Sequence, residues 1–291
     1  MSTQPIDPAL EQPKHLTRRL IAQPESITVR GRQLAFTHDR GDPGRVPLIM
    51  CNGIGSSMEL FDPLVTHLDP GRPVVRFDVP GIGGSARPKL PYVYHQLALA
   101  MRALLGELGY SSADVLGISW GGGLAQQFAF QYPRFCRRSV LVATATGVFM
   151  VPAGPQVLGR MLTPRRHRDP EYALSIAGTI YGGSARRDPD GAVKLLHSSM
   201  RATPIRGYLY QLAAIACWTS LPWLPLIRQP TLVLAGDDDP VIPSINGSIM
   251  ATLLPHGELH RYAGGHLALC TEPDELAPVI DEFLDRVDSQ V

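Results

Sequence analysis

The chain has 291 residues, of which 44% are hydrophobic and 18% are charged, so its composition can build a sizeable core and excludes a disordered protein. Its 27 Lys and Arg residues nearly balance its 26 Asp and Glu residues, which gives a net charge of +1. No overall basic field therefore exists to hold nucleic acid or an anionic membrane. The length suits a single α/β domain that carries an insertion.

Residues 1–24 are polar and contain prolines, and we expect them to form a flexible N-terminal arm. They lack the apolar segment of a secretory signal peptide, and no apolar run of about 18 residues predicts a transmembrane segment. The four cysteines are widely spaced and form no CxxC pair, so neither a disulfide framework nor a zinc site is expected. We interpret them as buried side chains in a reducing compartment, which favours a cytoplasmic protein.

Residues 25–147 alternate between apolar runs and helical patterns, and we interpret them as the first part of an α/β core. A hairpin is predicted at residues 27–36, strands at 47–51, 74–78, 114–118 and 139–143, and helices at 58–68, 94–108 and 121–132. Continuous apolar runs are typical of strands that are buried on both faces. The alternation therefore predicts a mostly parallel central sheet with helices on both faces.

The alternation stops in residues 148–226, which contain no clear strand. Helices are predicted there at 172–180, 192–201 and 208–218, before residues 227–291 complete the core with strands at 231–235 and 258–262 and a helix at 273–287. We therefore predict a helical cap, or lid, between two strands at whose carboxyl ends α/β active sites form. A second small domain without a role at the site is the alternative.

The sequence Gly117-Ile118-Ser119-Trp120-Gly121 matches G-x-S-x-G, directly after a predicted strand and before a predicted helix. This is the context of a nucleophile elbow, which presents a serine hydroxyl at the helix N-terminus. The flanking glycines are needed because a Cβ atom would clash in so tight a turn. We predict Ser119 as the nucleophile; a glycine-rich turn with a capping serine is the alternative.

A serine hydroxyl needs a base, and His266 lies in a loop after the last predicted strand. The acid that orients this base should follow a late strand, where Asp237, Asp238 and Asp239 compete. In hydrolases of this architecture the acid stands in G-x-x-D-x-x-x-P, which selects Asp239. The chain order Ser, Asp, His is that of the α/β hydrolases.

An oxyanion hole requires two backbone N–H donors. We predict Trp120, directly after the nucleophile, and Ile54, in the loop after the strand at 47–51. In the cap, apolar Phe149, Met150, Tyr181 and Trp218 are candidates to line a substrate pocket, although most such residues are expected in the core. The basic cluster at residues 165–168 is interpreted as a solvated face.

With these motifs the chain resembles the intracellular medium-chain-length polyhydroxyalkanoate depolymerases, which are α/β hydrolases. The resembling segments are residues 51–55, 77–85 and 117–122 in the core, 179–183, 186–189 and 218–220 in the cap, and 229–243. The resemblance implies an α/β-hydrolase fold and hydrolysis of a stored 3-hydroxyacyl polyester at cytoplasmic granules.

The predicted reaction is ester hydrolysis through an acyl-enzyme, and it needs neither a metal nor an organic cofactor. The substrate is a polyester or a small ester. A general carboxylesterase or lactonase, a C–C hydrolase and a cofactor-free haloperoxidase remain alternatives on the same scaffold. A non-catalytic granule-binding or receptor protein is the alternative from another class. Chain-length preference, exo or endo action and oligomeric state leave no signal in the sequence.

Overall fold

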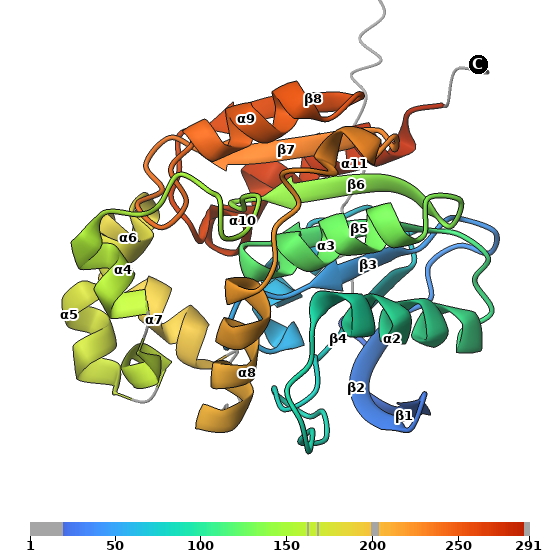
Figure 1. The fold of residues 1–291 in the computed structure, drawn as a ribbon, viewed down its shortest axis with the longest axis horizontal. Helices are drawn as coiled ribbons and strands as arrows, with labels where there is room; N and C mark the ends of the chain where they lie inside the picture. Colours follow the sequence, from blue (N-terminus) through green and yellow to red (C-terminus); the bar gives the residue numbers. More distant parts are fainter. Residues whose placement is uncertain (1–19, 162, 168, 199–203, 288–291) are drawn as a thin grey trace, which may run out of the picture.

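The centre of the fold is an eight-stranded, mostly parallel sheet (Figure 1). The computed structural model describes residues 20–161, 163–167, 169–198 and 204–287, so the arm predicted at residues 1–24 lies largely outside the described residues. The strands are β1 (Glu25–Val29), β2 (Arg32–Asp39), β3 (Leu48–Cys51), β4 (Val74–Phe77), β5 (Ala113–Ile118), β6 (Cys136–Val142), β7 (Thr231–Gly236) and β8 (Gly257–Tyr262). Their order is β1-β2-β4-β3-β5-β6-β7-β8, with antiparallel pairing of β2 to β1 and β4 and parallel pairing elsewhere. The predicted α/β architecture is confirmed.

Alternate residues of the buried strands face two separate hydrophobic cores, one on each side of the sheet. In β3, Leu48 and Met50 belong to one core, whereas Ile49 belongs to the other. The strand β7 divides its side chains in the same way, with Leu232 in the first core and Val233 in the second. Because both faces are covered by helices, every position of these strands can be apolar, which explains the continuous apolar runs in the sequence.

Two sets of helices cover the sheet. One face carries α2 (Tyr94–Glu107), α3 (Trp120–Gln131) and α9 (Ile245–Leu253), and the other carries the 3-10 helix η1 (Met58–Phe61), α1 (Asp62–Val65), α10 (Ala268–Thr271) and α11 (Pro273–Asp285). Figure 1 shows α2 and α3 in front of the sheet. The single helix predicted at 58–68 is divided into η1 and α1, since Pro63 has no N–H with which to continue one α-helix.

The segment 148–226, called the cap segment below, lies between β6 and β7 in the chain. Its helices are α4 (Pro155–Met161), η2 (Pro164–His167), α5 (Pro170–Tyr181), α6 (Ser184–Arg187), α7 (Pro189–Ser198), α8 (Ile205–Ala216) and η3 (Leu224–Leu226). Figure 1 shows α4 to α8 together at the end of the sheet toward which the arrowheads of β6 and β7 point. The prediction of a helix at 192–201 includes residues 199–201, which lie outside the described part of the chain.

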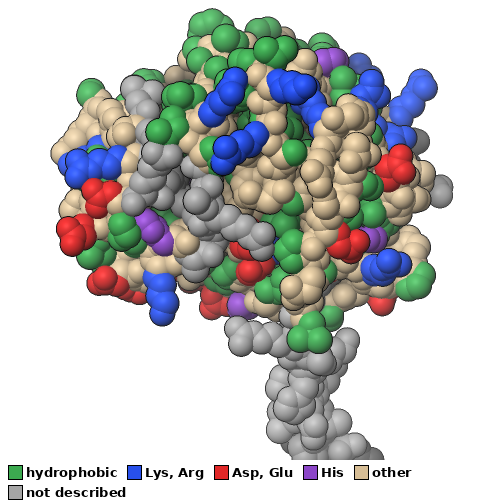
Figure 2. Space-filling view, turned by 90° about the horizontal axis from the view of Figure 1, so that it is seen from below, with side chains coloured by type: hydrophobic (Ala, Val, Ile, Leu, Met, Phe, Trp, Pro, Cys, Tyr) green, Lys and Arg blue, Asp and Glu red, His purple; other side chains and the backbone are tan. Residues whose placement is uncertain are grey.

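Several large apolar side chains of the cap segment are exposed to solvent. Phe149 is 66% exposed, and Val148 and Leu209 are about half exposed. Figure 2, seen from below Figure 1, shows hydrophobic side chains grouped toward its upper edge with Lys and Arg side chains beside them, and acidic side chains elsewhere on the same face. Within the described residues, no helix combines the length and apolar character that crossing a membrane requires.

Candidate active site

Ser119 occupies a strained turn between the end of β5 and the start of α3. Its backbone has φ 54° and ψ −120°, a conformation that a non-glycine residue rarely adopts. The turn is tight: a Cβ atom on Gly117 would lie 2.2 Å from the carbonyl oxygen of Gly121, and one on Gly121 would lie 2.1 Å from that of Cys51. The glycines of the G-x-S-x-G sequence are therefore required by close backbone contacts, as the sequence predicts.

His266 and Asp239 form a buried pair. The Nδ1 atom of His266 lies 2.8 Å from Oδ2 of Asp239, and their side chains are 6% and 1% exposed. The other oxygen of Asp239 accepts the backbone N–H groups of Val241 and Ile242, each at 2.9 Å. Because a carboxylate accepts hydrogen bonds, we assign Nδ1 of His266 as the donor in this contact.

The two neighbouring aspartates have different partners. Asp237 pairs with Arg261 at 2.6 Å. Asp238 accepts two hydrogen bonds from Arg186, at 2.8 and 2.9 Å, and a third from the Gly183 N–H at 2.7 Å. The Arg186 guanidinium lowers the pKa of Asp238, which keeps this carboxylate ionised. Asp238 therefore joins the core to the cap segment, while Asp239 is the aspartate in contact with His266.

The loop that carries His266 is also held by the cap segment. The backbone N–H of His266 donates to the carbonyl of Tyr181 at 2.7 Å, and the two rings are stacked with centroids 6.5 Å apart. A Cβ atom on Gly183 would lie 2.2 Å from the nitrogen of Gly265, so the two loops are in close backbone contact. The last turn of α5 thus positions the imidazole.

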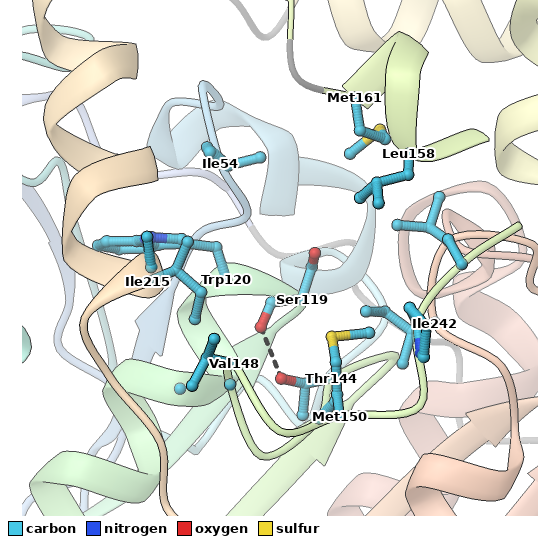
Figure 3. A pocket seen from close by; sticks show the side chains of 17 residues that line it. Ile54, Ser119, Trp120, Thr144, Val148, Met150, Leu158, Met161, Ile215 and Ile242 are labelled. Atoms are coloured by element: carbon cyan, nitrogen blue, oxygen red, sulfur yellow. Dashed lines mark hydrogen bonds between the residues drawn. The ribbon is translucent and has the colours of Figure 1, made fainter. Parts of the chain in front are cut away.

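Ser119 and His266 line the same small cavity, of about 30 Å³, whose wall also includes Ile54, Tyr181 and Arg166. Among the described residues, no hydrogen bond reaches the Ser119 hydroxyl; its backbone carbonyl accepts the Thr144 hydroxyl at 2.6 Å, the bond drawn in Figure 3. Catalytic hydrogen bonds are often long without substrate and tighten when it binds. The shared cavity gives Ser119 and His266 a common reaction space.

The loop of residues 52–55 approaches Ser119 from β3. A Cβ atom on Gly53 would lie 3.8 Å from the Cβ of Ser119. The loop is fixed by the cap segment, since the Gly55 N–H donates to the Gln211 side chain at 2.8 Å. The backbone carbonyl of Gln211 accepts the Trp120 indole N–H at 2.9 Å. In the described part of the chain the Ile54 N–H has no hydrogen-bond acceptor, so it is available to an oxyanion.

A larger, apolar cavity of about 410 Å³ also has Ser119 in its wall (Figure 3). Its wall includes Val148, Met150, Leu158, Met161, Ile215 and Ile242. Of the four candidate pocket residues, Met150 lines this cavity and Tyr181 lines the small one. Phe149 points to solvent. Trp218 lies outside both linings and donates its indole N–H to Gln127 at 2.9 Å.

Two side chains of the site, Arg166 and Gln211, were not singled out from the sequence. Arg166 belongs to the basic cluster at 165–168 that was expected to be solvated, yet it is only 4% exposed. That expectation is wrong for Arg166, whose guanidinium donates to the buried Tyr208 hydroxyl of α8; Arg166 also lines the small cavity. A glutamine within a helix and an arginine within a basic run carry no local signal of a distant partner.

Comparisons with known proteins show which proteins this chain resembles. The family model described as alpha/beta hydrolase fold matches residues 46–273. A curated poly(3-hydroxyalkanoate) depolymerase of Ectopseudomonas oleovorans is 48% identical over 247 residues, which cover 84% of this chain and 87% of that protein. The 3-oxoadipate enol-lactonase 2 of Acinetobacter baylyi is 24% identical over 246 residues, which cover 84% of this chain and 91% of that protein.

Among solved structures, the enol-lactonase from Burkholderia xenovorans LB400 superposes with a TM-score of 0.77 at 23% identity, over 90% of this chain and 100% of that one. A thermophilic esterase from Thermogutta terrifontis gives a TM-score of 0.76 at 22% identity, over 90% of this chain and 98% of that one. At this level of identity the two structures establish a common fold.

Proposed function

Because this chain belongs to the α/β hydrolase family, we propose that it hydrolyses poly(3-hydroxyalkanoate) polyester with Ser119, His266 and Asp239 as its catalytic triad. Its 48% identity to a curated depolymerase confirms the resemblance seen in the sequence and makes it a carboxylic ester hydrolase. The observation that carries the proposed triad is the buried His266–Asp239 pair, 2.8 Å apart, beside the cavity that Ser119 also lines.

The proposed reaction proceeds through an acyl-enzyme. The Ser119 hydroxyl attacks the ester carbonyl while Nε2 of His266 takes its proton, and Asp239 holds the imidazole tautomer and stabilises the imidazolium. His266 then gives the proton to the leaving alcohol as the C–O bond breaks. In the second half, His266 activates a water molecule that hydrolyses the acyl-Ser119 ester.

We assign the oxyanion hole to the backbone N–H groups of Ile54 and Trp120. Trp120 is the first residue of α3, so its N–H is among those that a helix leaves without an internal acceptor. Its position after the nucleophile and the unused N–H of Ile54 in the facing loop support the assignment. Two such donors, held rigidly, stabilise the negative charge that forms on the carbonyl oxygen.

The apolar lining of the large cavity supports an aliphatic polyester as substrate. The 410 Å³ cavity beside Ser119 is lined mainly by apolar side chains, which suits the alkyl side chain and acyl part of a 3-hydroxyacyl unit. We propose that residues 148–226 act as the cap that roofs this cavity. Exposed apolar residues such as Phe149 would face the insoluble polymer, and we assign the protein to storage granules in the cytoplasm.

The decisive experiment compares wild type with Ser119→Ala on medium-chain polyhydroxyalkanoate granules and on p-nitrophenyl octanoate. We expect Ser119→Ala to lower both rates by on the order of 10⁴-fold or more. The exposed Ser175→Ala is the matched control and should leave both rates unchanged. A fluorophosphonate probe should label wild type but not Ser119→Ala.

Product analysis distinguishes hydrolysis of the polyester from hydrolysis of small esters alone. Release of 3-hydroxy acids from granules supports the proposal. Cleavage of small esters without any release from polyester would make the protein a general carboxylesterase instead. Near-full activity of Ser119→Ala on both substrates would refute the proposed nucleophile.

A further inference from the structure

Arg166 is a buried guanidinium without an acidic partner. Its Nη1 atom donates to the carbonyls of Met161 and Thr163, at 3.2 and 3.4 Å, and to the Tyr208 hydroxyl at 3.1 Å. All three acceptors are neutral oxygen atoms. Its Nε atom is buried and has no hydrogen-bond partner. In the part of the chain that the structure describes, no Asp or Glu forms an ion pair with this residue.

Another buried arginine of the same protein shows how a buried positive charge is usually compensated. Arg72, also almost fully buried, pairs with Asp281 and Asp285, each at 2.9 Å. A buried charge is costly unless an opposite charge or a full set of hydrogen bonds compensates it. Arg166 has neither, because Nε is unsatisfied and the neighbouring Tyr181 hydroxyl is neutral: burial raises the pKa of Tyr181. The missing partner of Arg166 is therefore an anion that the described chain does not supply.

The position of Arg166 identifies which part of a substrate could supply that anion. Arg166, His266 and Ser119 line the small cavity together, whereas the large apolar cavity shares Ser119 but is lined by neither Arg166 nor His266. His266 must protonate the leaving alcohol, so the alcohol part of the ester belongs on the His266 side. The acyl part then takes the large cavity, and Arg166 faces the leaving group.

We propose that Arg166 binds a free carboxylate on the leaving alcohol, and that the enzyme consequently removes units from the carboxyl end of the polyester. This inference rests on the proposed function. At that end of the chain, the leaving alcohol is a single 3-hydroxy acid whose carboxylate lies within the same unit as the leaving oxygen. Hydrolysis breaks the ester C–O bond, His266 protonates the departing oxygen, and water completes the acyl group as a new terminal carboxylate.

A terminal unit suits Arg166 better than an internal unit does. Arg166 lines the small cavity, where an internal unit would place a neutral ester and a terminal unit places a carboxylate. A guanidinium can hold a carboxylate with two parallel hydrogen bonds, and its Nε atom, which lacks a partner here, is one of the donors used in that arrangement. The new carboxylate formed in each cycle would recreate the recognised end.

A pair of matched esters tests this inference. One is the octanoyl ester of 3-hydroxyoctanoic acid, and the other is the octanoyl ester of the corresponding 3-hydroxy primary amide. The acyl group and scissile bond are identical, and only the charge of the leaving alcohol differs. We expect wild type to cleave the acid with a kcat/KM at least about tenfold higher than the amide, the range of a charge-assisted hydrogen bond.

The variants assign this preference to one residue. Arg166→Gln should bring the acid-to-amide ratio close to one, and Arg166→Lys should retain part of it because a charge remains. Arg165→Gln is the matched control, since Arg165 is 61% exposed and pairs with Asp169, and it should keep the full ratio. As a measurement on wild type alone, free 3-hydroxyoctanoate should inhibit about tenfold more strongly than its amide.

Two outcomes would overturn the inference. One is equal kcat/KM of wild type for the two esters, which decides the matter even if Arg166→Gln does not fold. The other is an unchanged ratio in Arg166→Gln. In both, loss of activity in Ser119→Ala would show that the proposed function still holds, whereas hydrolysis that persists in Ser119→Ala would refute that function itself.

Discussion

The backbone N–H of His266 donates a hydrogen bond to the carbonyl of Tyr181 across 2.7 Å, which joins the base of the proposed triad to the last turn of α5. The cap segment therefore supports the imidazole as well as covering the cavity. Two further contacts reinforce this junction, namely the bond from the Gly183 N–H to Asp238 and the ion pair of Asp238 with Arg186. A change that displaces the loop of His266 at this junction should lower the rate of the reaction at Ser119.

Gly183→Ala should disturb the junction directly. Gly183 has a φ of +49°, and a Cβ atom there would lie 2.2 Å from the nitrogen of Gly265. Because this contact is with backbone, the loop of His266 must shift, and misplacement by about 1 Å can cost about 100-fold in rate. We expect kcat for p-nitrophenyl octanoate to fall at least about tenfold.

The matched control for this change is Gly159→Ala in α4, where nothing lies within 4 Å of the added Cβ. This variant should keep the wild-type kcat, and the replacement of glycine in a helix should leave stability equal or slightly higher. Circular dichroism and thermal unfolding verify that both variants are folded. Wild-type kcat in a folded Gly183→Ala would contradict a positioning role of the junction.

Asp239→Asn tests the assignment among the three adjacent aspartates. An asparagine can present its NH₂ group to Nδ1 of His266 and so favour the wrong imidazole tautomer, which in a serine triad typically costs about 10⁴-fold in kcat. Asp238→Asn is the control of identical chemistry one residue away. It removes the exposed ion pair with Arg186, worth at most about 1 kcal/mol, while the asparagine oxygen can still accept the Gly183 N–H, so kcat should stay within about threefold.

Steady-state kinetics on p-nitrophenyl octanoate distinguish the two aspartates. The assignment would be wrong if Asp238→Asn lost activity as severely as Asp239→Asn. Fluorophosphonate labelling gives a second readout, because Ser119 in Asp239→Asn should react far more slowly than in Asp238→Asn.

Features with a local chemical cause were predictable from the sequence. The strands β3, β5 and β7 are continuous apolar runs because both faces of the sheet are covered, and the elbow glycines have no room for a side chain. The helix α9 was not predicted, because Asn246, Gly247 and other weak helix formers hide its pattern. It forms because Gly247 allows close packing on Ala235 of β7.

Features that depend on distant contacts were not predictable. Arg166 is buried by Tyr208, 42 residues away, although its neighbours Arg165 and Arg168 make the local sequence strongly polar. Gln211 meets Gly55 across 156 residues of the chain. Tertiary packing of the cap segment against the core creates both contacts, and nothing in the local patterns of hydrophobicity or charge encodes them.

The cysteines provide a test that the nucleophile is a serine. Cys51 adjoins the loop of Ile54, but it is buried, and burial raises the pKa of its thiol, so little thiolate is available. Cys217 is exposed at the end of α8, so the expectation that all four cysteines are buried is wrong at this position. We expect iodoacetamide to modify Cys217 first, without loss of esterase activity, and to reach Cys51 only after unfolding. Mass spectrometry of the labelled peptides beside activity measurements checks this; inactivation that follows modification of Cys51 would contradict it.

Gln211→Met should weaken the oxyanion hole without touching the triad. Gln211 is fully buried, and its side-chain oxygen accepts the Gly55 N–H at 2.8 Å, next to the Ile54 donor. Methionine fills a similar volume but removes this acceptor, at a cost of about 1–3 kcal/mol. The loop should shift, and we expect kcat on p-nitrophenyl octanoate to fall about tenfold, with a smaller change in KM because the apolar cavity is intact.

Gln127→Met is the matched control, because this glutamine also accepts a side-chain hydrogen bond, a partly buried one from Trp218 at 2.9 Å, but lies away from the loop of residues 52–55. It should lower thermal stability to a similar extent and leave kcat unchanged. If both substitutions lowered kcat in proportion to their loss of stability, Gln211 would have only a structural role. A loss of kcat confined to Gln211→Met places the control of the oxyanion hole in helix α8, so that the cap segment positions the oxyanion donor through Gln211 and the base through Tyr181.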